Sequence, residues 1–381
     1  MHEELFEKID ELSGEYLDLL EDICNVESPT NHKAGVDAVG EYCASVARKN
    51  GWDVEIFSQE VSGNSVLITM NADADAAPIV FSAHMDTVHP LGSFGTPATH
   101  RDEEKMYGPG VTDCKGGVAA ALLAMRALSE IGFSARPVKL YLQSDEENNS
   151  NGSNKKTVEE MCRAAKDAVG FINLEGSVPE TAVLTRKGIA RYKFTVHGRA
   201  IHSARCAYGA SAVCEAAHKI IELEKMKDPD GITCNCVIVS GGDAPNTVPE
   251  LCEFTADIRF ANGGELEEAR ALVYEIAEKC FVEGCSTEVK EISLRPAMAK
   301  SDKNDAFLAR MNDIYEKCSM TPLAPRFAQG GSDAAYITEF GVPCVDSLGP
   351  CGDFIHSVRE MVRLSSVADS AKRIATVALY I

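Results

Sequence analysis

The predicted architecture of this chain rests on IVFSAHMDTVHP, residues 79–90. Its first part, Ile79 to Ala83, is a run of apolar and small residues that is typical of a buried strand. Residues two apart on a strand point to the same face, so His84 and Asp86 project together from the strand's carboxyl end. Open α/β sheets hold their active sites at this end. A His beside a carboxylate indicates either a metal ligand with the residue that orients it, or a hydrogen-bonded structural pair.

The length and charge of the chain restrict its class. With 381 residues, 45% of them hydrophobic, it is long enough for two domains or for one large domain with an insertion. Its net charge of -21 argues against nucleic acid and anionic membranes as partners, because phosphate groups bind stripes of Lys and Arg. No apolar stretch reaches the ~18 residues of a membrane span.

The amino-terminal sequence and the cysteines favour a cytoplasmic protein. Residues 1–23 are acidic and amphipathic, without the basic region and apolar core of a signal peptide. The 14 cysteines include no C-x-x-C pair, and Cys234 and Cys236 have no second pair to complete a zinc ribbon. We therefore expect reduced thiols in the cytoplasm.

The order of the predicted elements divides the chain into three segments. Residues 1–186 alternate strands and helices, which is typical of a mostly parallel sheet with helices on both faces. Residues 187–296 follow the order strand-helix-strand-strand-helix-strand of a ferredoxin-like unit, and residues 297–381 return to the first pattern. We therefore predict an α/β catalytic domain, with a mixed and mostly parallel sheet, that is interrupted by an inserted α+β domain.

Acidic and imidazole side chains follow several predicted strands of the first domain. They are His84, Asp113, the pair Glu146 and Glu147, Glu175 and, far along the chain, His356. Any one of them alone is explained by a helix cap or a solvated loop. Together they outnumber the basic residues near them, and buried carboxylates without cations are costly. This charge balance predicts divalent metal at the strand ends.

Asp113 and the glutamate pair suit different roles in such a site. Asp113 lies in a Gly-rich turn before a helix, where it either caps the helix or, with both oxygens free, bridges two metal ions. Neighbouring residues at a strand end point in different directions. One of Glu146 and Glu147 can therefore bind metal while the other faces a bound water as general base.

Nine short motifs resemble those of a known enzyme family. They are HMDTV (84–88), GPGVTDCKGG (108–117), DEE (145–147), NLEG (173–176), GRAIHSA (198–204), PNTVPE (245–250), DIR (257–259), GGSDA (330–334) and HSVRE (356–360). In this order they resemble the co-catalytic dizinc hydrolases, which include glutamate carboxypeptidases, peptidase T, aminoacylase, acetylornithine deacetylase and succinyl-diaminopimelate desuccinylase. The resemblance covers essentially the whole chain.

The resemblance implies two metal sites that share Asp113 as a bridge. The remaining ligands that it implies are His84 and Glu175 for one ion, and Glu147 and His356 for the other. It also implies that Glu146 is the general base and that Asp86 orients His84. Zinc is the expected metal, and cobalt and manganese also suit mixed nitrogen and oxygen ligands.

The resemblance assigns residues of the inserted domain to the substrate and to a partner subunit. His202 resembles a His that reaches the partner's active site and stabilises the oxyanion, which implies a homodimer with the inserted domain as its dimerisation and lid domain. Arg259 and Asn246 resemble residues that hold the substrate's carboxylate. The backbone amides of Gly330 and Gly331, which we expect to open a helix, suit the same anion.

The predicted function is metal-dependent hydrolysis of an amide bond in a peptide or N-acyl amino acid. The layout most resembles the glutamate carboxypeptidases, which implies release of a C-terminal amino acid such as glutamate. Arg186 and Lys187 would then contact an acidic side chain, or they are solvated hinge residues. The alternatives are a deacylase of a small N-acyl amino acid, a di- or tripeptidase, and a metal-binding regulator without catalysis. Departures from the family, such as His89 where Pro is frequent, leave the substrate open.

Overall fold

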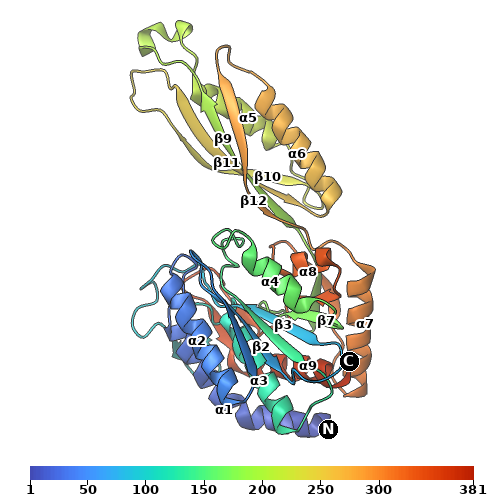
Figure 1. Ribbon diagram of the computed structural model, residues 1–381. Coiled ribbons are helices and arrows are strands. Elements are labelled where there is room, and N and C mark those ends of the chain that lie inside the picture. The colour runs from blue at the N-terminus through green and yellow to red at the C-terminus, as the bar shows by residue number, and fades with distance from the viewer. The chain divides into compact units, whose positions relative to one another are not determined.

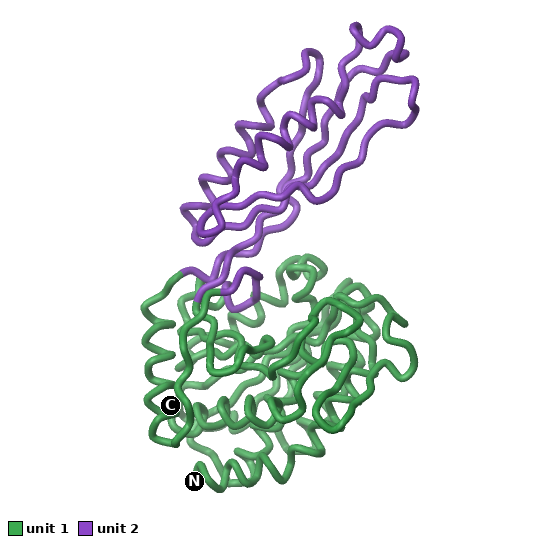
Figure 2. The backbone as a smooth tube through the Cα atoms, turned by 180° about the vertical axis from the view of Figure 1, so that it is seen from behind, with its two compact units in different colours: residues 1–184, 300–327, 336–381 green, residues 185–299, 328–335 purple.

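The chain builds two units from alternating stretches of its sequence. The computed structural model describes residues 1–381. Unit 1 comprises Met1–Leu184, Lys300–Phe327 and Tyr336–Ile381, and unit 2 comprises Thr185–Ala299 and Ala328–Ala335 (Figure 2). The short stretch 328–335, which contains the GGSDA glycines, therefore groups with unit 2 although its neighbours on both sides belong to unit 1.

A six-stranded mixed sheet forms the centre of unit 1 (Figure 1). In spatial order its strands are β1 (Asp53–Phe57), β2 (Ser65–Met70), β6 (Val138–Gln143), β3 (Ile79–His84), β7 (Gly170–Asn173) and β14 (Cys344–Val345). The pairings β6–β3, β3–β7 and β7–β14 are parallel, and β1–β2 and β2–β6 are antiparallel. The predicted mixed, mostly parallel sheet is confirmed.

Helices cover both faces of this sheet. Those of unit 1 are α1 (His2–Asn25), α2 (Lys33–Lys49), α3 (Lys115–Glu130), α4 (Lys156–Ala165), α7 (Asp302–Lys317), α8 (Ala334–Phe340, which starts in unit 2) and α9 (Leu364–Tyr380). The chain passes from β3 through α3 to β6, and then from β6 through α4 back across β3 to β7. Because both crossovers are right-handed but run in opposite directions, α3 and α4 lie on opposite faces. All six residues of β3 are consequently buried.

Short strands that the sequence pattern did not reveal complete unit 1. They are β4 (His100–Arg101), β5 (Lys105–Tyr107), β15 (Gly352–Asp353) and β16 (Met361–Arg363) in one small sheet, and β8 (Thr181–Arg186) with β13 (Ala324–Ala328) in another. The strands β4, β5, β15 and β16 have only two or three residues, which carry no hydrophobic period, so only their partners define them. The pairing of β5 with β16 matters for the site, because the Asp113 loop follows β5 and the His356 loop precedes β16.

Unit 2 has the ferredoxin-like order that the sequence predicts. Its elements are β9 (Gly188–His197), the 3-10 helix η1 (Ser203–Tyr208), α5 (Ala212–Leu223), β10 (Thr233–Gly241), β11 (Leu251–Phe260), α6 (Gly263–Glu278) and β12 (Ser286–Arg295). The sheet order is β10-β11-β9-β12, with every pairing antiparallel. One face of β9 and β11 packs under α5 and α6, while the other face carries ion pairs such as Arg191–Asp257 and Lys193–Glu253.

No helix in the structure combines the length and the apolar character needed to cross a lipid bilayer.

The amino-terminal turn of α3 approaches the end of β7 so closely that only glycine fits there. A Cβ atom at Gly117 would lie 2.3 Å from the carbonyl oxygen of Leu174, next to Glu175. We predict that Gly117→Ala lowers the free energy of unfolding by about 1–3 kcal/mol through overpacking, as measured by denaturant unfolding. Gly14→Ala is the control, because Gly14 lies in α1 with open space around it and should gain up to about 1 kcal/mol. Unchanged stability of Gly117→Ala would contradict the close approach.

Candidate metal centre

Three neighbouring parallel strands bring their carboxyl ends together in unit 1. His84 ends β3, Glu147 follows β6, and Glu175 follows β7, in the sheet order β6-β3-β7. Parallel pairing aligns these ends at one edge of the sheet, which is why residues some 90 positions apart in the sequence meet there.

Asp113 lies between two sets of side chains, with one oxygen directed at each. Its Oδ1 is 2.9 Å from Nε2 of His84, and that nitrogen is 3.8 Å from Oε1 of Glu175. Its Oδ2 is 3.1 Å from Nε2 of His356, which is 3.3 Å from Oε2 of Glu147. The structure therefore brings all five sequence-predicted metal ligands together, in the two groups expected from the resemblance.

Asp86 holds the backbone of the glutamate pair as well as lying beside His84. Its carboxylate accepts hydrogen bonds from the amides of Glu146 and Glu147, both at 3.1 Å, and from the Thr30 hydroxyl at 2.7 Å. Nδ1 of His84 is 2.9 Å from the backbone oxygen of Asp86 and 3.4 Å from its Oδ1. With Nδ1 engaged in this way, Nε2 is the nitrogen that faces Asp113.

The charges in this cluster are strongly unbalanced. Burial raises the pKa of Glu147 to about 7, and the neighbouring Asp113 and Glu146 charges add to the effect. Burial, with the charge of Asp113, also raises the pKa of Glu175 well above its usual value. Hydrogen bonds that the His356 imidazole donates to the carboxylates of Asp113 and Glu147 raise the pKa of His356 to about 10. Burial beside other carboxylates thus disfavours the charged forms of Glu147 and Glu175, which added positive charge would stabilise.

The donor set fits divalent metal ions. Mixed imidazole and carboxylate ligands suit zinc and related ions. Two groups, His84 with Asp113 and Glu147, and His84 with Cys114 and Glu175, have their potential ligand atoms within 4.8 Å of one another. Oε1 of Glu147 is buried and has no hydrogen-bond partner in the protein, as expected of an oxygen directed toward a cation.

The predicted substrate residues belong to unit 2. His202 is exposed and precedes η1, and its Nδ1 accepts a hydrogen bond from the amide of Ala204 at 3.1 Å. The exposed Asn246 lies beside it, since its carbonyl oxygen accepts from the amide of Ser203. Arg259, on β11, donates from Nε and Nη2 to the carboxylate of Asp257.

The local structure at Gly330, Gly331 and Lys187 differs from what the sequence predicts, and Arg186 contacts one of these glycines. Helix α8 begins at Ala334, so Gly330 and Gly331 precede it by three residues or more and do not open it. Nη1 of Arg186 donates to the carbonyl of Gly330. Lys187 is buried, and its Nζ donates to the carbonyls of Pro229 and Gly231, both at 2.7 Å. A solvated role for Lys187 is therefore wrong, because its ammonium group is bound within unit 2.

Three residues at the centre received no role from the sequence. Thr30 binds Asp86, while His89 and Glu360 form a buried pair with 2.8 Å between Nε2 and Oε2. Glu360 is the last residue of the HSVRE motif, so an acid at a fixed distance from His356 was the one available signal.

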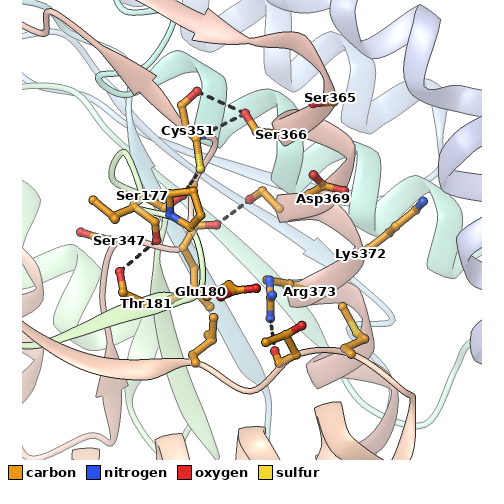
Figure 3. A pocket seen from close by; sticks show the side chains of 18 of the residues that line it. Ser177, Glu180, Thr181, Ser347, Cys351, Ser365, Ser366, Asp369, Lys372 and Arg373 are labelled. Carbon is orange, nitrogen blue, oxygen red and sulfur yellow. Dashed lines mark hydrogen bonds between the residues drawn. The ribbon is translucent and has the colours of Figure 1, made fainter.

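A separate cavity of about 490 Å³ lies elsewhere in unit 1 (Figure 3). None of the predicted site residues lines it. Several of its polar groups have partners in the protein: the Ser366 hydroxyl accepts from the amide of Cys351, Ser370 donates to the carbonyl of Leu348, and Arg373 donates to that of Thr321. The cluster of candidate metal ligands, and not this cavity, is the candidate site of chemistry.

Comparisons with known proteins find relatives of this chain. The sequence profile of the family described as Peptidase family M20/M25/M40 matches residues 80–380. Carboxypeptidase G2 of Pseudomonas sp. (strain RS-16) is 26% identical over 354 residues, which cover 91% of this chain and 85% of the relative. Acetylornithine deacetylase of Myxococcus xanthus is 26% identical over 326 residues, 80% of this chain and 82% of the relative. The fold is similar to that of a tripeptidase of Staphylococcus aureus, with a TM-score of 0.79 and 19% identity over 96% of this chain and 97% of that one.

Metal binding should release protons from this site. In the metal-free chain at pH 6, Glu147 with its pKa of about 7 and His356 with its pKa of about 10 both hold protons that a cation must displace. We predict that zinc affinity rises from pH 6 to pH 8, as Glu147 loses its proton, and that fewer protons are released at pH 8. Calorimetric zinc titrations in two buffers of different ionisation enthalpy measure this release. Heats that are the same in both buffers would contradict the prediction.

Proposed function

This chain belongs to the peptidase family M20/M25/M40, and on that basis we propose that it is a metal-dependent exopeptidase which releases a C-terminal amino acid from a peptide or N-acyl amino acid. The family assignment, predicted from the nine motifs, makes the chain a hydrolase of amide bonds. The observation that carries the proposal is the placement of Asp113 between the two ligand groups, one oxygen to each. The likeness to carboxypeptidase G2 over 91% of the chain supports the carboxypeptidase reaction.

The five ligands would hold two divalent ions, most simply zinc. His84 and Glu175 would bind the first and Glu147 and His356 the second, with Asp113 shared. Such ions polarise the scissile carbonyl and lower the pKa of water. The protein holds the ligands in place through β3, the ends of β6 and β7, and the loops that follow β5 and precede β16.

Glu146 is the general base in this proposal. It follows β6 directly before the ligand Glu147, and both backbone amides are bonded to Asp86. Glu147 is directed at His356, so its neighbour Glu146 points in a different direction, as a division into ligand and base requires. Glu146 would take a proton from the attacking water and deliver it to the leaving amine nitrogen.

Residues of unit 2 would bind the charged parts of the substrate. Nδ1 of His202 accepts a hydrogen bond from the amide of Ala204, which leaves Nε2 protonated and able to donate to an oxyanion. The guanidinium of Arg259 is oriented by Asp257, and its planar shape suits a carboxylate. Asn246, Gly330 and Gly331 stay predictions, since only the motif resemblance supports their contact with substrate.

Two other activities remain close to this proposal. A deacylase of a small N-acyl amino acid would use the same ligands, and the likeness to acetylornithine deacetylase favours it. A di- or tripeptidase is the other candidate.

A preference for glutamate loses one of its arguments, because Lys187 is bound to backbone carbonyls within unit 2. A catalytically inactive regulator is disfavoured by Glu146, which such a protein does not need. The cytoplasmic location stays a prediction.

We also propose that the chain forms a homodimer through the edge of unit 2. Strand β10 exposes Val237, Ile238 and Val239, which are 49%, 64% and 56% exposed. The opposite edge strand, β12, alternates charged residues such as Glu288 and Lys290, which protect an edge from pairing. An apolar edge of this kind is complementary to a second copy of itself.

Glu146→Gln tests the chemistry. We expect it to bind two zinc ions with wild-type stoichiometry but to lower turnover by about 10²–10⁴-fold, because only the proton carrier is lost. The assay uses dipeptides with C-terminal Glu or Leu, a tripeptide and an N-acetyl amino acid, and the preferred substrate separates carboxypeptidase from deacylase and tripeptidase. Glu159→Gln, an exposed residue of α4, is the control. Loss of metal as well as turnover would mean that base and ligand are misassigned.

Ile238→Lys tests the dimer. A charge on the apolar edge should convert the protein to a monomer in sedimentation at micromolar concentration and lower kcat together with dimer content, if His202 acts in the partner's site. Ile292→Lys is the matched control, since Ile292 is exposed to 43% on the opposite edge strand β12. A wild-type protein that is fully active as a monomer at nanomolar concentration would overturn the role of His202.

A further inference from the structure

Glu360 is a buried carboxylate with an unusual number of donors. It is 0% exposed. Its Oε1 accepts from the amides of Thr112 at 2.9 Å and Asp113 at 3.0 Å. Its Oε2 accepts from the amide of Gly110 at 3.2 Å and lies 2.8 Å from Nε2 of His89. Four donors satisfy a buried carboxylate without any Lys or Arg partner.

These donors come from the loops that carry the metal ligands. Three of them are backbone amides of the turn that ends at Asp113, and one of the three is the amide of Asp113 itself. The fourth, His89, lies five residues after His84, on the loop that also contains Asp86. Glu360 itself follows His356 by four residues, and its amide donates to the carbonyl of Ser357 within the same loop at 3.0 Å.

The main chain around Glu360 joins the same two loops. Strands β5 and β16 pair with Met361 opposite Tyr107, and the amide of Gly108 donates to the carbonyl of Glu360. The hydroxyl of Thr112 donates to the carbonyl of Met361 at 2.8 Å. The Asp113 loop follows β5 and the His356 loop precedes β16, so the two loops adjoin the same pair of strands. The Glu360 carboxylate lies between them.

From this arrangement we propose that Glu360 is the positioning residue of the metal centre, holding the Asp113 loop and the His356 loop at the separation at which one Asp113 oxygen faces each ligand group. The proposal rests on the proposed metal centre and concerns a residue that does not touch the ions. Asp113 can serve both groups only if its main chain is fixed, because its two oxygens must reach His84 at 2.9 Å and His356 at 3.1 Å together. Partners behind metal ligands fix ligand orientation in this way.

The proposal predicts that the two ions respond unequally. The second ion, between Glu147 and His356, depends on Glu360 twice, through Asp113 and through the loop of His356. The first ion keeps His84 and Glu175, and Glu360 reaches it only through Asp113 and, more weakly, through His89. In Glu360→Gln the amide group faces the donor N–H of Gly110, so that the loop loses its fixed position while the side-chain volume is unchanged.

The test measures metal binding and not only turnover. Metal-free wild type, Glu360→Gln, His89→Leu and the exposed control Glu103→Gln are titrated with Co²⁺ and Zn²⁺ against a chromophoric chelator. The visible Co²⁺ spectrum reports coordination geometry, and circular dichroism reports folding of the metal-free chain. We expect Glu360→Gln to weaken one of the two binding steps by about 10–100-fold and to change the Co²⁺ spectrum. His89→Leu should show a smaller change in the same direction, and Glu103→Gln none.

Each result supports or overturns the proposal. Two binding steps within twofold of wild type and an unchanged Co²⁺ spectrum in Glu360→Gln would overturn it, even if that variant melts at a lower temperature, because general destabilisation leaves coordination unaltered. If Glu360→Gln does not fold, His89→Leu decides, and wild-type affinities there would overturn the proposal. Fewer than two ions bound by the wild type itself would show that the proposed metal centre is wrong, and the role of Glu360 would fall with it.

Discussion

The carboxylate of Asp113 faces an imidazole with each of its oxygens, His84 on one side and His356 on the other. These two histidines are 272 positions apart in the chain, and they reach the same carboxylate only if a central strand and a late loop end at one place. Glu147 and Glu175 add charge that burial makes costly, as their raised pKa values show. The centre of unit 1 is thus organised around a site that needs added positive charge to be stable.

The topology of the sheet explains how this charge is gathered without disturbing the core. Two right-handed crossovers place α3 and α4 on opposite faces of β3, so that the strand is buried along its length, and its one titratable residue, His84, is at its end. The neighbours of β3 are parallel to it, and their acidic residues follow the last buried position of each strand. The residues that pack the core and the residues of the candidate metal centre therefore lie at different positions along the strands. Neither set disturbs the other.

The sheet of unit 2 is packed differently from the central sheet of unit 1. Its sheet packs two helices on one face and carries ion pairs on the other, as an antiparallel sheet with one solvated face does. Its two edges differ in character, since β10 presents Val237, Ile238 and Val239 while β12 alternates charged residues.

Hydrophobic periodicity and motif order determined the larger part of the architecture. The buried strand predicted at Ile79 to Ala83 is β3, Ile79–His84, because a run of apolar and small residues is a local signal. The residue types of the candidate metal ligands could likewise be read from the sequence, since metal binding requires imidazole and carboxylate side chains. What only the tertiary structure decided are the contacts between distant segments: which Asp113 oxygen faces which histidine, the burial of Lys187, and the Glu360 carboxylate beneath the Asp113 loop. These depend on donors and acceptors that the chain brings together from far apart, and no local pattern records them.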